Sequence, residues 1–466
     1  MSKKNLWDKT PTSIKSTLGR VLEIAPPTWW LGKKYRKNCK FLRDAQWWQA
    51  ERAREYQLSR LRETLTLAYQ KTDFYRCKFD TVGFHPQDFR SLEDIIHLPT
   101  IDKDTVIKDI TAMCARSVKS PDVDYGSTGG TSGTPLHFYM DSNRSYVEYA
   151  YLTTSWERIG YTIGMPMAVI RGRVIRPNRD DFYHEYDPIL RHHYYSNFHM
   201  TEHNMSRYLR HIRKIGPCVL HTYASSAHTF AKFVLETGEQ MPRNVKAILL
   251  ESENVYADQV NDIERAFGAR TFSLYGHSEK LVLAAQCEHS NHYHVWPTYG
   301  YFELLDKNGK PVTTRGQQGE IVGTGFINMV MPFIRYRTGD WATYVGDRCE
   351  ACGREHTIIS DIKGRWPQGW LIAADGSVVT MTALNVHDDT LKNVREYQFH
   401  QSTPGKATLC IIPNIPLGDQ EQELIIANMN KRLQGQVTLN LEIRTKLVKT
   451  ARGKQSRVIQ KCTSST

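Results

Sequence analysis

The sequence of 466 residues has no long uninterrupted run of apolar side chains. Its apolar runs stay well short of the roughly 18 residues that a membrane-spanning helix needs, and its first residues lack the apolar core of a secretory signal. We therefore expect a cytoplasmic protein. Cysteine is sparse, and the odd number of nine argues against a disulfide framework. The cysteines are expected to be metal ligands or buried thiols.

Recognisable nucleic-acid-binding patterns are also missing, because no helix-turn-helix, RNA-recognition or zinc-finger pattern accompanies the net charge of +12. We expect no nucleic-acid partner. Residues 1–40 hold ten Lys and Arg against two acidic residues, which gives this segment a charge of +8. With Trp7, Trp29 and Trp30, such a basic arm could contact an anionic membrane surface or an acidic polymer. The alternative is a solvated extension that packs its tryptophans on the domain.

The composition, with 40% hydrophobic and 24% charged residues, is that of an ordinary globular protein. A cluster of glycine and proline between residues 361 and 376 predicts a domain boundary. We expect a basic aromatic arm over 1–40, a large domain over 41–364 and a small C-terminal lid domain over 365–466. The sequence does not indicate an oligomeric state.

Hydrophobic periodicity predicts an α/β fold. Residues 41–70 have the spacing of one helix. Four short apolar runs predict buried parallel strands with helices between them: Met167–Ile170, Cys218–Leu220, Ala247–Leu250 and Thr271–Leu274. The C-terminal region is expected to form an α+β unit in the order strand, strand, helix, strand, over 397–399, 407–412, 420–433 and 439–445.

A glycine-rich segment at residues 125–135 is a candidate phosphate-binding loop. Its glycines let backbone N–H groups converge on phosphate oxygens, and its hydroxyls add donors without bulk. It lacks the lysine of a Walker loop, which argues against a P-loop NTPase. A plain surface loop is the alternative. The residues expected to bind nucleotide here are Thr128, Gly129, Gly130, Thr131, Ser132 and Gly133.

This segment resembles the Ser/Thr-Gly-Thr-Thr/Ser-Gly-x-Pro signature of acyl-adenylate-forming ligases, and the other signatures of that superfamily follow in order. They are Ser273–Glu279, Arg335–Asp340, Asp361–Arg365 and Gly453–Arg457. The chain is identified as a member, similar over residues 50–466 to the branch of phenylacetate–CoA ligase and the capsular-polysaccharide CapK proteins. Leu98–Lys103 matches a further segment of that branch.

The resemblance implies a large adenylate-forming domain with parallel sheets and a mobile lid, and it assigns roles to residues. Tyr275 stacks on adenine, Asp340 binds both ribose hydroxyls and Glu279 holds Mg²⁺. Arg365 contacts ribose or phosphate oxygens, and Lys454 stabilises the anionic transition state. The remaining residues expected near the nucleotide are Ser252, Glu253, Gly276, His277 and Ser278.

The expected reaction uses ATP and Mg²⁺ to convert a carboxylic acid to acyl-AMP with release of pyrophosphate. The acyl group then passes to an amine or hydroxyl, in surface-polysaccharide or secondary-metabolite biosynthesis. One alternative is a phenylacetate-type ligase with the thiol of CoA as acceptor, and another is a catalytically silent nucleotide-binding scaffold. The resemblance places candidate acyl-pocket residues at Tyr223 and Ser225. Arg171 follows a predicted strand and could pair with an anionic acid or a phosphorylated acceptor, and an exposed structural arginine is the alternative.

Cys349 and Cys352 form a CxxC pair, and residues 287–294 supply one more thiolate and three imidazoles. Two short knuckles separated by a β-rich insertion are typical of structural zinc. Buried unliganded thiols and a redox pair are the alternatives. Some members of the resembled branch carry such a cluster, and their spacing selects His294 over His292. The predicted zinc ligands are Cys287, His294, Cys349 and Cys352.

Overall fold

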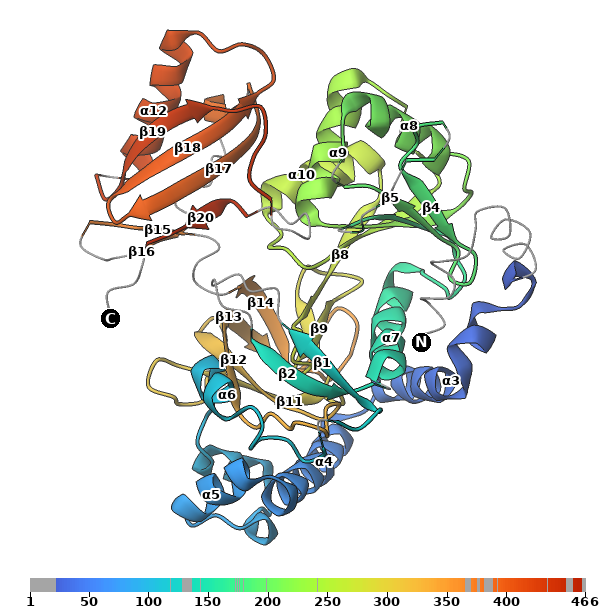
Figure 1. The fold of residues 1–466 in the computed structure, drawn as a ribbon, viewed down its shortest axis with the longest axis vertical. Coiled ribbons are helices and arrows are strands. Elements are labelled where there is room, and N and C mark those ends of the chain that lie inside the picture. The colour runs from blue at the N-terminus through green and yellow to red at the C-terminus, as the bar shows by residue number, and fades with distance from the viewer. Residues whose placement is uncertain are drawn as a thin grey trace.

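The computed structural model describes residues 22–117, 119–127, 136–142, 144–171, 173, 175, 177–178, 180–197, 199–240, 242–364, 370–374, 378–380, 389–391, 393–433, 435–449 and 456–462. Helices α4 (Ala50–Lys71) and α5 (Asp73–Thr81) form one end of the molecule (Figure 1). An antiparallel part of the sheet lies next to them, followed by a parallel part, and the C-terminal strands with helix α12 stand to one side.

One twelve-stranded sheet forms the body, in the order β11-β12-β13-β14-β10-β9-β8-β7-β6-β3-β5-β4. Strands β5, β3, β6, β7 and β8 are parallel, and the other pairings are antiparallel. The strands are β3 (Met167–Ile170), β4 (His184–Asp187), β5 (His192–Tyr195), β6 (Cys218–Thr222), β7 (Val245–Leu250), β8 (Arg270–Gly276), β9 (Leu283–Gln286), β10 (Tyr293–Val295), β11 (Gly300–Leu305), β12 (Gln318–Gly325), β13 (Tyr336–Gly346) and β14 (Ile358–Lys363).

Helices cover both faces of the parallel half, as buried parallel strands require. On one face, apolar side chains of α8 (Glu202–Ile212), α9 (Ala224–Thr237) and α10 (Ala257–Phe267) pack on β3, β6 and β7. On the other face, α7 (Arg144–Trp156) contributes Trp156 to a second cluster. The four predicted parallel strands and the α/β class are confirmed.

The helix predicted over residues 41–70 is wrong, because the chain turns at residues 46–49 between α3 (Pro27–Ala45) and α4 (Ala50–Lys71). The Trp48 indole donates to Asp44 at 2.7 Å inside this turn. The backbone N–H of Ala50 donates to Glu355 at 2.7 Å, so a distant carboxylate caps α4. A local reading of periodicity contains no signal for such a partner.

Part of the expected basic arm is folded. Helix α3 packs against α7, burying Tyr35, Cys39 and Leu42, and the Tyr35 hydroxyl lies 2.9 Å from that of Thr153. Trp29 and Trp30 are 71% and 47% exposed, so the alternative that these tryptophans pack on the domain is wrong for this pair. Trp7 lies outside the described residues.

Several short elements complete the N-terminal half. They are α5 (Asp73–Thr81), the 3-10 turns η1 (Pro86–Asp88) and η2 (Leu92–His97), α6 (Lys103–Asp109), β1 (Val123–Ser127) and β2 (His137–Asp141). Strands β1 and β2 form a separate hairpin that pairs Ser127 with His137. Among the helices that the structure describes, none combines the length and apolarity needed to cross a membrane.

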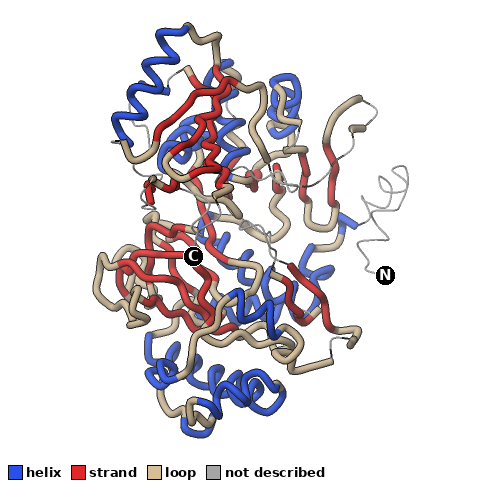
Figure 2. The backbone as a smooth tube through the Cα atoms, turned by 60° about the vertical axis from the view of Figure 1, so that its left-hand side comes forward, coloured by secondary structure: helices blue, strands red, loops and turns tan. Residues whose placement is uncertain are grey.

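The C-terminal region has its own sheet and core. A four-stranded sheet has the order β19-β18-β17-β20, and α12 packs on it around a buried cluster that includes Phe399, Leu409 and Met429 (Figures 1 and 2). The predicted strand, strand, helix, strand order is confirmed. The elements are β15 (Trp370–Ile372), β16 (Val378–Thr380), η5 (Asp389–Leu391), β17 (Val394–Thr403), β18 (Lys406–Pro413), α12 (Asp419–Leu433), β19 (Thr438–Ile443) and β20 (Val458–Gln460).

Candidate active site

Two hydrogen bonds join the second and third sequence signatures. The Tyr275 hydroxyl, at the end of β8, donates to Asp340 Oδ2 on β13 at 2.9 Å. The Tyr336 hydroxyl donates to Glu279 Oε1 at 3.4 Å, and His277 Nδ1 lies 3.4 Å from Glu279 Oε2. Glu279 is 1% exposed and Asp340 is 9% exposed. Residues 65 positions apart in the chain thus bring two buried carboxylates and an aromatic ring to one place.

The loop after β7 reaches the same place. A Cβ atom built on Gly364 would lie 3.3 Å from Asn254 Oδ1 and 3.8 Å from Asp340 Oδ1. Gly364 follows β14 and immediately precedes Arg365. The end of the fourth signature therefore lies against Asp340, with little room for a larger side chain.

Arg335 ties the early Leu98–Lys103 segment to the third signature. Its guanidinium pairs with Glu303 at 2.8 Å and donates to the Leu98 carbonyl at 2.6 Å, with both charged side chains buried. The backbone of Ile101 pairs with the residues on either side of Tyr336. A buried, bidentate Arg–carboxylate pair fixes this segment beside the site.

A partly buried polar cluster forms where strands β3, β6 and β7 end. Arg171 donates to Glu251 Oε2 at 2.9 Å and to the Ser252 hydroxyl at 2.8 Å. His221 Nε2 lies 3.1 Å from the same Glu251 oxygen. Burial by itself raises the pKa of Glu251, but His221 and Arg171 outweigh burial and lower the pKa to about 2. Glu251 is therefore an anion at neutral pH.

The other candidate residues of this region also have defined partners. Glu253 accepts from the backbone N–H and the hydroxyl of Ser225, at 2.8 Å and 3.0 Å. A carboxylate at these first N–H groups of α9 is a favourable helix-terminal interaction. The Arg171 guanidinium lies 5.3 Å from the centre of the Tyr223 ring. The three expected acyl-pocket residues are thus brought together with Ser252 and Glu253.

Several predicted residues lie outside the part of the chain that the structure describes. They are Thr128, Gly129, Gly130, Thr131, Ser132, Gly133, Arg365 and Lys454. The glycine-rich residues stand in sequence between β1 and β2. Gly276 ends β8, and Ser278 stands between His277 and Glu279.

His221, Glu251 and Asn254 belong to segments that the resemblance places at the acyl pocket (221–226) and beside the adenine (251–254), but the sequence did not single them out as site residues. A general signal was available, because Arg171, Tyr223, Glu251 and His277 each follow the end of a parallel strand. In parallel α/β sheets, ligands bind outside the carboxyl ends of the strands. That rule picks out this edge of the sheet once the strands are known.

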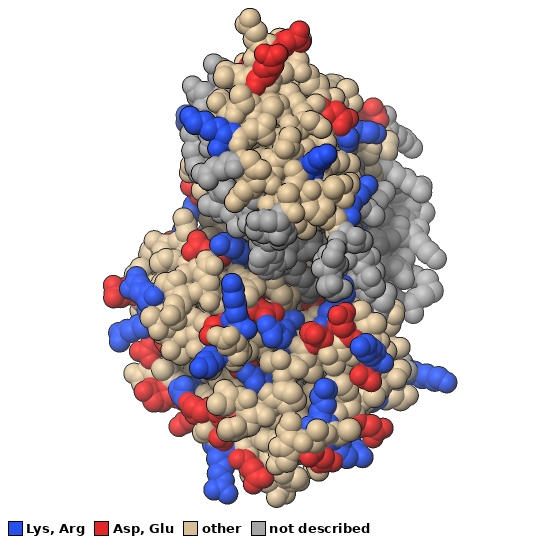
Figure 3. Space-filling view, turned by 90° about the vertical axis from the view of Figure 1, so that its left-hand side faces the viewer, with Lys and Arg blue, Asp and Glu red and all other residues tan. Residues whose placement is uncertain are grey.

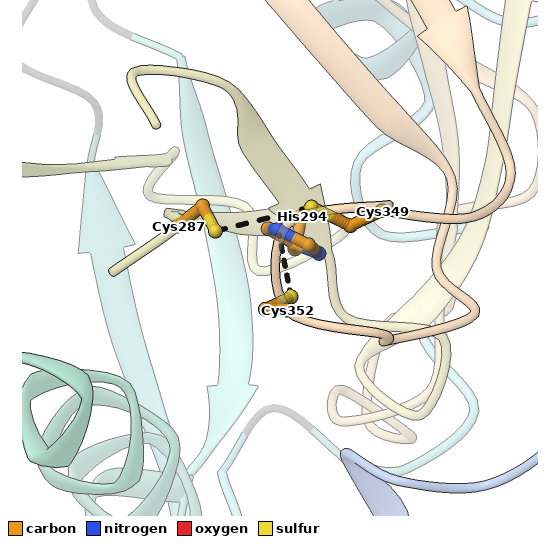
Figure 4. Close-up of side chains that lie close together, drawn as sticks. All are labelled: Cys287, His294, Cys349 and Cys352. Carbon is orange, nitrogen blue, oxygen red and sulfur yellow. Dashed lines mark hydrogen bonds between the residues drawn. The ribbon is translucent and has the colours of Figure 1, made fainter. Parts of the chain in front are cut away.

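A second cluster joins two loops at β9, β10 and β13–β14. One ligand atom each of Cys287, His294, Cys349 and Cys352 lie within 4.8 Å of one another. The Cys287 and Cys349 sulfurs are 3.9 Å apart, and Cys352 Sγ is 3.8 Å from His294 Nε2 (Figure 4). The backbone N–H of His289 lies 3.4 Å from Cys287 Sγ. Three sulfurs and one imidazole are a donor set that suits tetrahedral zinc.

Buried charges brace this cluster. Arg354 donates to both oxygens of Glu288 at 2.7 and 2.8 Å, and its guanidinium lies 4.1 Å from the centre of the Trp47 ring. Arg354 also donates to the Gln46 side chain. The loop that carries Cys349 and Cys352 is therefore fixed to the turn between α3 and α4.

On the face in Figure 3, the Lys and Arg side chains are interspersed with Asp and Glu over the part below the grey atoms. In the described N-terminal region, Arg54 pairs with Glu93 and Arg52 pairs with Asp44.

Comparison with known proteins gives relatives but no match to a protein-family model. The Protein CapK of Staphylococcus aureus is 25% identical over 252 residues, which cover 54% of this chain and 54% of that protein. A phenylacetate-coenzyme A ligase of Thermus thermophilus is 24% identical over 320 residues, covering 68% of this chain and 71% of that protein. The similarity thus spans about half of the CapK relative.

Solved structures share the fold. A 2-hydroxyisobutyryl-CoA ligase in the postadenylation state, in complex with 2-HIB-AMP, has a TM-score of 0.68 at 19% identity, covering 89% of this chain and 91% of that chain. An acyl acid amido synthetase has a TM-score of 0.56 at 13% identity, covering 88% and 89%. The fold is that of acyl-adenylate-forming ligases. Among the curated proteins, CapK and phenylacetate-coenzyme A ligases are the sequence relatives that this chain resembles.

Proposed function

We propose that this protein is an AMP-forming ligase that activates a carboxylic acid with ATP and then transfers the acyl group to an acceptor. In the first step a carboxylate oxygen attacks the α-phosphorus of ATP, and the bond to pyrophosphate breaks. The product is a mixed anhydride whose AMP is a good leaving group. The observation that carries this proposal is the pair of hydrogen bonds from Tyr275 to Asp340 and from Tyr336 to Glu279.

These side chains have the chemistry that the nucleotide requires. The Asp340 carboxylate accepts hydrogen bonds from both ribose hydroxyls, which replace the Tyr275 hydroxyl as its partners. The Tyr275 ring offers an aromatic face to adenine. Glu279, a hard oxygen ligand, holds the Mg²⁺ that neutralises the phosphates. Gly276, His277 and Ser278 supply the turn between ring and carboxylate.

Three further groups act on the phosphates and the lid. The glycine-rich residues Thr128, Gly129, Gly130, Thr131, Ser132 and Gly133 donate backbone and hydroxyl hydrogen bonds to phosphate oxygens. Lys454 stabilises the charge shared by the attacking and leaving oxygens. Arg365 contacts ribose or phosphate oxygens at the start of the lid, over residues 365–466, which rotates between the two steps.

The acid is bound beside the cluster of Arg171, Tyr223 and Ser225. The Arg171 guanidinium is already paired with Glu251, so its charge is largely neutralised. This arrangement favours an acid whose remainder is uncharged or aromatic over one with a second anionic group. Tyr223 supplies an aromatic wall, and Ser252 and Glu253 border the same space.

The leading acceptor is an amine or hydroxyl, as in surface-polysaccharide or secondary-metabolite biosynthesis. The similarity to CapK supports this choice. The second candidate acceptor is the thiol of coenzyme A, which the similarity to phenylacetate-coenzyme A ligases favours. The protein acts in the cytoplasm in this proposal, and the exposed Lys33, Lys37 and Lys40 of α3 would contact an anionic surface.

Structural zinc belongs to the same proposal. Cys287, His294, Cys349 and Cys352 would hold one Zn²⁺ in a closed four-ligand site, which leaves no position for substrate. The three sulfurs and the imidazole already face one another from two loops. The ion stabilises those loops rather than taking part in the reaction.

Acid-dependent exchange of pyrophosphate into ATP tests the first step. We expect exchange with one class among aryl, hydroxy, amino and fatty acids, and a loss of at least about 100-fold in Lys454→Ala. Lys449→Ala, an exposed lysine of the same segment, serves as the matched control and should stay within about two-fold. If none of the acids supports exchange, although a separate measurement shows that ATP binds, the result would favour a catalytically silent scaffold.

The acceptor is tested with the acid found in that way. Coenzyme A, amines and alcohols are offered separately, and the product is identified by mass spectrometry. An amide or ester supports the leading candidate, whereas a thioester supports the CoA ligase. AMP release without any acyl product in all three cases would count against a transferase half-reaction with these acceptors.

A further inference from the structure

Histidine is concentrated in one part of the parallel half that the proposed reaction does not use. Six of the 18 histidines lie between residues 184 and 211. Strands β4 and β5 are antiparallel, with His184 opposite Tyr195 and Tyr186 opposite His193. This register places these four side chains on one face of the sheet. Helix α8 packs on that face and brings His211 from its last turn.

Three imidazoles meet there. One ring nitrogen each of His184, His193 and His211 lie within 4.8 Å of one another. His184 Nε2 is 3.1 Å from His193 Nδ1, and the ring centre of His211 is 4.5 Å from that of His184. All three side chains are partly exposed, so solvent and ions can reach them.

A neighbouring hydroxyl orients the third ring. The Tyr195 hydroxyl lies 2.7 Å from His211 Nδ1. When a histidine binds a metal through one ring nitrogen, the other commonly donates its proton to a nearby oxygen, which fixes the tautomer and the ring orientation. Tyr195 is buried and cannot readily turn away. The His211 Nε2 atom is thereby left available.

We propose that His184, His193 and His211 bind one late first-row divalent metal ion, with Zn²⁺ as the favoured ion. Imidazole nitrogen suits zinc, copper and nickel, and three protein ligands leave one position for water or another donor. Zinc–nitrogen bonds of about 2.0–2.1 Å require the nitrogens to approach to roughly 3.3 Å. The His184–His193 pair is already that close, and the His211 ligand nitrogen lies within 4.8 Å of both.

This site shares no residue with the Cys287 cluster, and the two can be counted separately. Tag-free full-length protein is freed of metal and titrated with Zn²⁺, with stoichiometry read by mass spectrometry and calorimetry. We expect two ions per chain, and one in Cys349→Ser/Cys352→Ser. With Co²⁺, only the cysteine site should show thiolate charge-transfer absorption, and the histidine site should show weak d–d bands alone.

Variants locate the second ion. His211→Gln should lower the affinity for the second ion at least 10-fold. Tyr195→Phe should also lower this affinity, because the His211 ring loses the partner that orients it. His203→Gln, an exposed histidine in the first turn of the same helix, is the matched control and should not change it. Thermal unfolding checks that each variant is folded. A single ion that disappears in the cysteine variant, or a second ion indifferent to His211→Gln, overturns the proposal.

Discussion

Arg457, which immediately precedes β20, donates a hydrogen bond to Asp258 Oδ2 in the first turn of α10 at 2.7 Å. Its guanidinium lies 4.0 Å from the ring centre of Tyr256 and 5.0 Å from that of Tyr397. Burial by itself lowers the pKa of Arg457, but Tyr397 and Asp258 outweigh burial and raise it. Arg457 stands three residues after Lys454, so this contact joins the end of the last signature to helix α10.

The first prediction concerns that contact. Asp258→Asn removes the charge partner of a buried arginine, which costs about 1.5–3 kcal/mol and corresponds to roughly 10-fold or more in an equilibrium. If the docked arrangement is the one that forms acyl-AMP, ATP–pyrophosphate exchange should fall by about that factor. Glu442→Gln, which breaks the exposed pair with Arg444 inside the C-terminal sheet, is the control and should leave exchange unchanged. Unchanged exchange in both variants would contradict the docking role.

The second prediction tests Asp340 as a ribose ligand. Asp340→Ala should raise the KM for ATP by roughly 100-fold, because two hydrogen bonds to a charged acceptor are lost. Asp347→Ala provides a control, since Asp347 also accepts from a tyrosine hydroxyl, that of Tyr344 at 2.6 Å, away from the site. The KM for ATP of this control should not change. Equal effects of the two substitutions would point to strand stability rather than nucleotide binding.

The third prediction concerns magnesium. Glu279→Gln keeps the size of the side chain and removes the negative charge, so the Mg²⁺ concentration for half-maximal exchange should rise about 10-fold or more. The acid concentration for half-maximal exchange should move much less. Tyr336→Phe, which removes the hydroxyl donor to Glu279, should leave the magnesium dependence nearly intact. Parallel shifts in both concentrations would argue against a metal role for Glu279.

The fourth prediction concerns metal at the cysteine cluster. Purified protein should contain a zinc ion that is lost in Cys352→Ser, with a fall in the thermal midpoint on the order of 5 °C. Cys77→Ser, at an exposed cysteine outside the cluster, should retain both zinc and midpoint. A protein whose midpoint does not respond to loss of this zinc would have a cluster without a structural role.

The fifth prediction follows from the acidity of Glu251. Its pKa is about 2 in the folded chain against an ordinary value of 4.5, so the folded state binds protons less readily. The ionised Glu251 therefore contributes about 3 kcal/mol to the free energy of unfolding. This contribution is fully present above pH 4.5 and is lost as the pH falls from 4.5 towards 2. Glu251→Gln should therefore flatten the acid limb of unfolding free energy measured in urea. An acid limb identical to that of the unchanged protein would contradict the assigned pKa.

Periodicity and short motifs were enough to predict much of this fold. The apolar runs at 167–170 and 247–250 are buried parallel strands, and the helix predicted over 420–433 is α12. These elements are local in origin, since burial on both faces requires continuous apolar runs and one-sided burial requires helical spacing. The turn at residues 46–49 was missed, because the carboxylate that caps the start of α4 belongs to the distant Glu355.

Only those residues of the candidate site that belong to short sequence motifs could be predicted from the sequence. Tyr275 and Asp340 belong to recognisable signatures, and the structure brings them together. His221 and Glu251 lie next to Arg171 through the adjacency of three strands, which no short motif encodes. The histidine cluster depends in the same way on the register of β4 with β5 and on the packing of α8.

The cap that Glu355 provides to Ala50 spans 305 positions of the chain, and this separation has a consequence for the order of folding. During synthesis the N-terminal helices leave the ribosome early, yet the carboxylate that caps the start of α4 does not exist until translation has passed the CxxC loop. Contacts between residues so far apart in the sequence form late, and they make folding slower. Nascent chains stalled before residue 355 should therefore expose the 46–50 turn to protease, and chains stalled well beyond it should protect that turn.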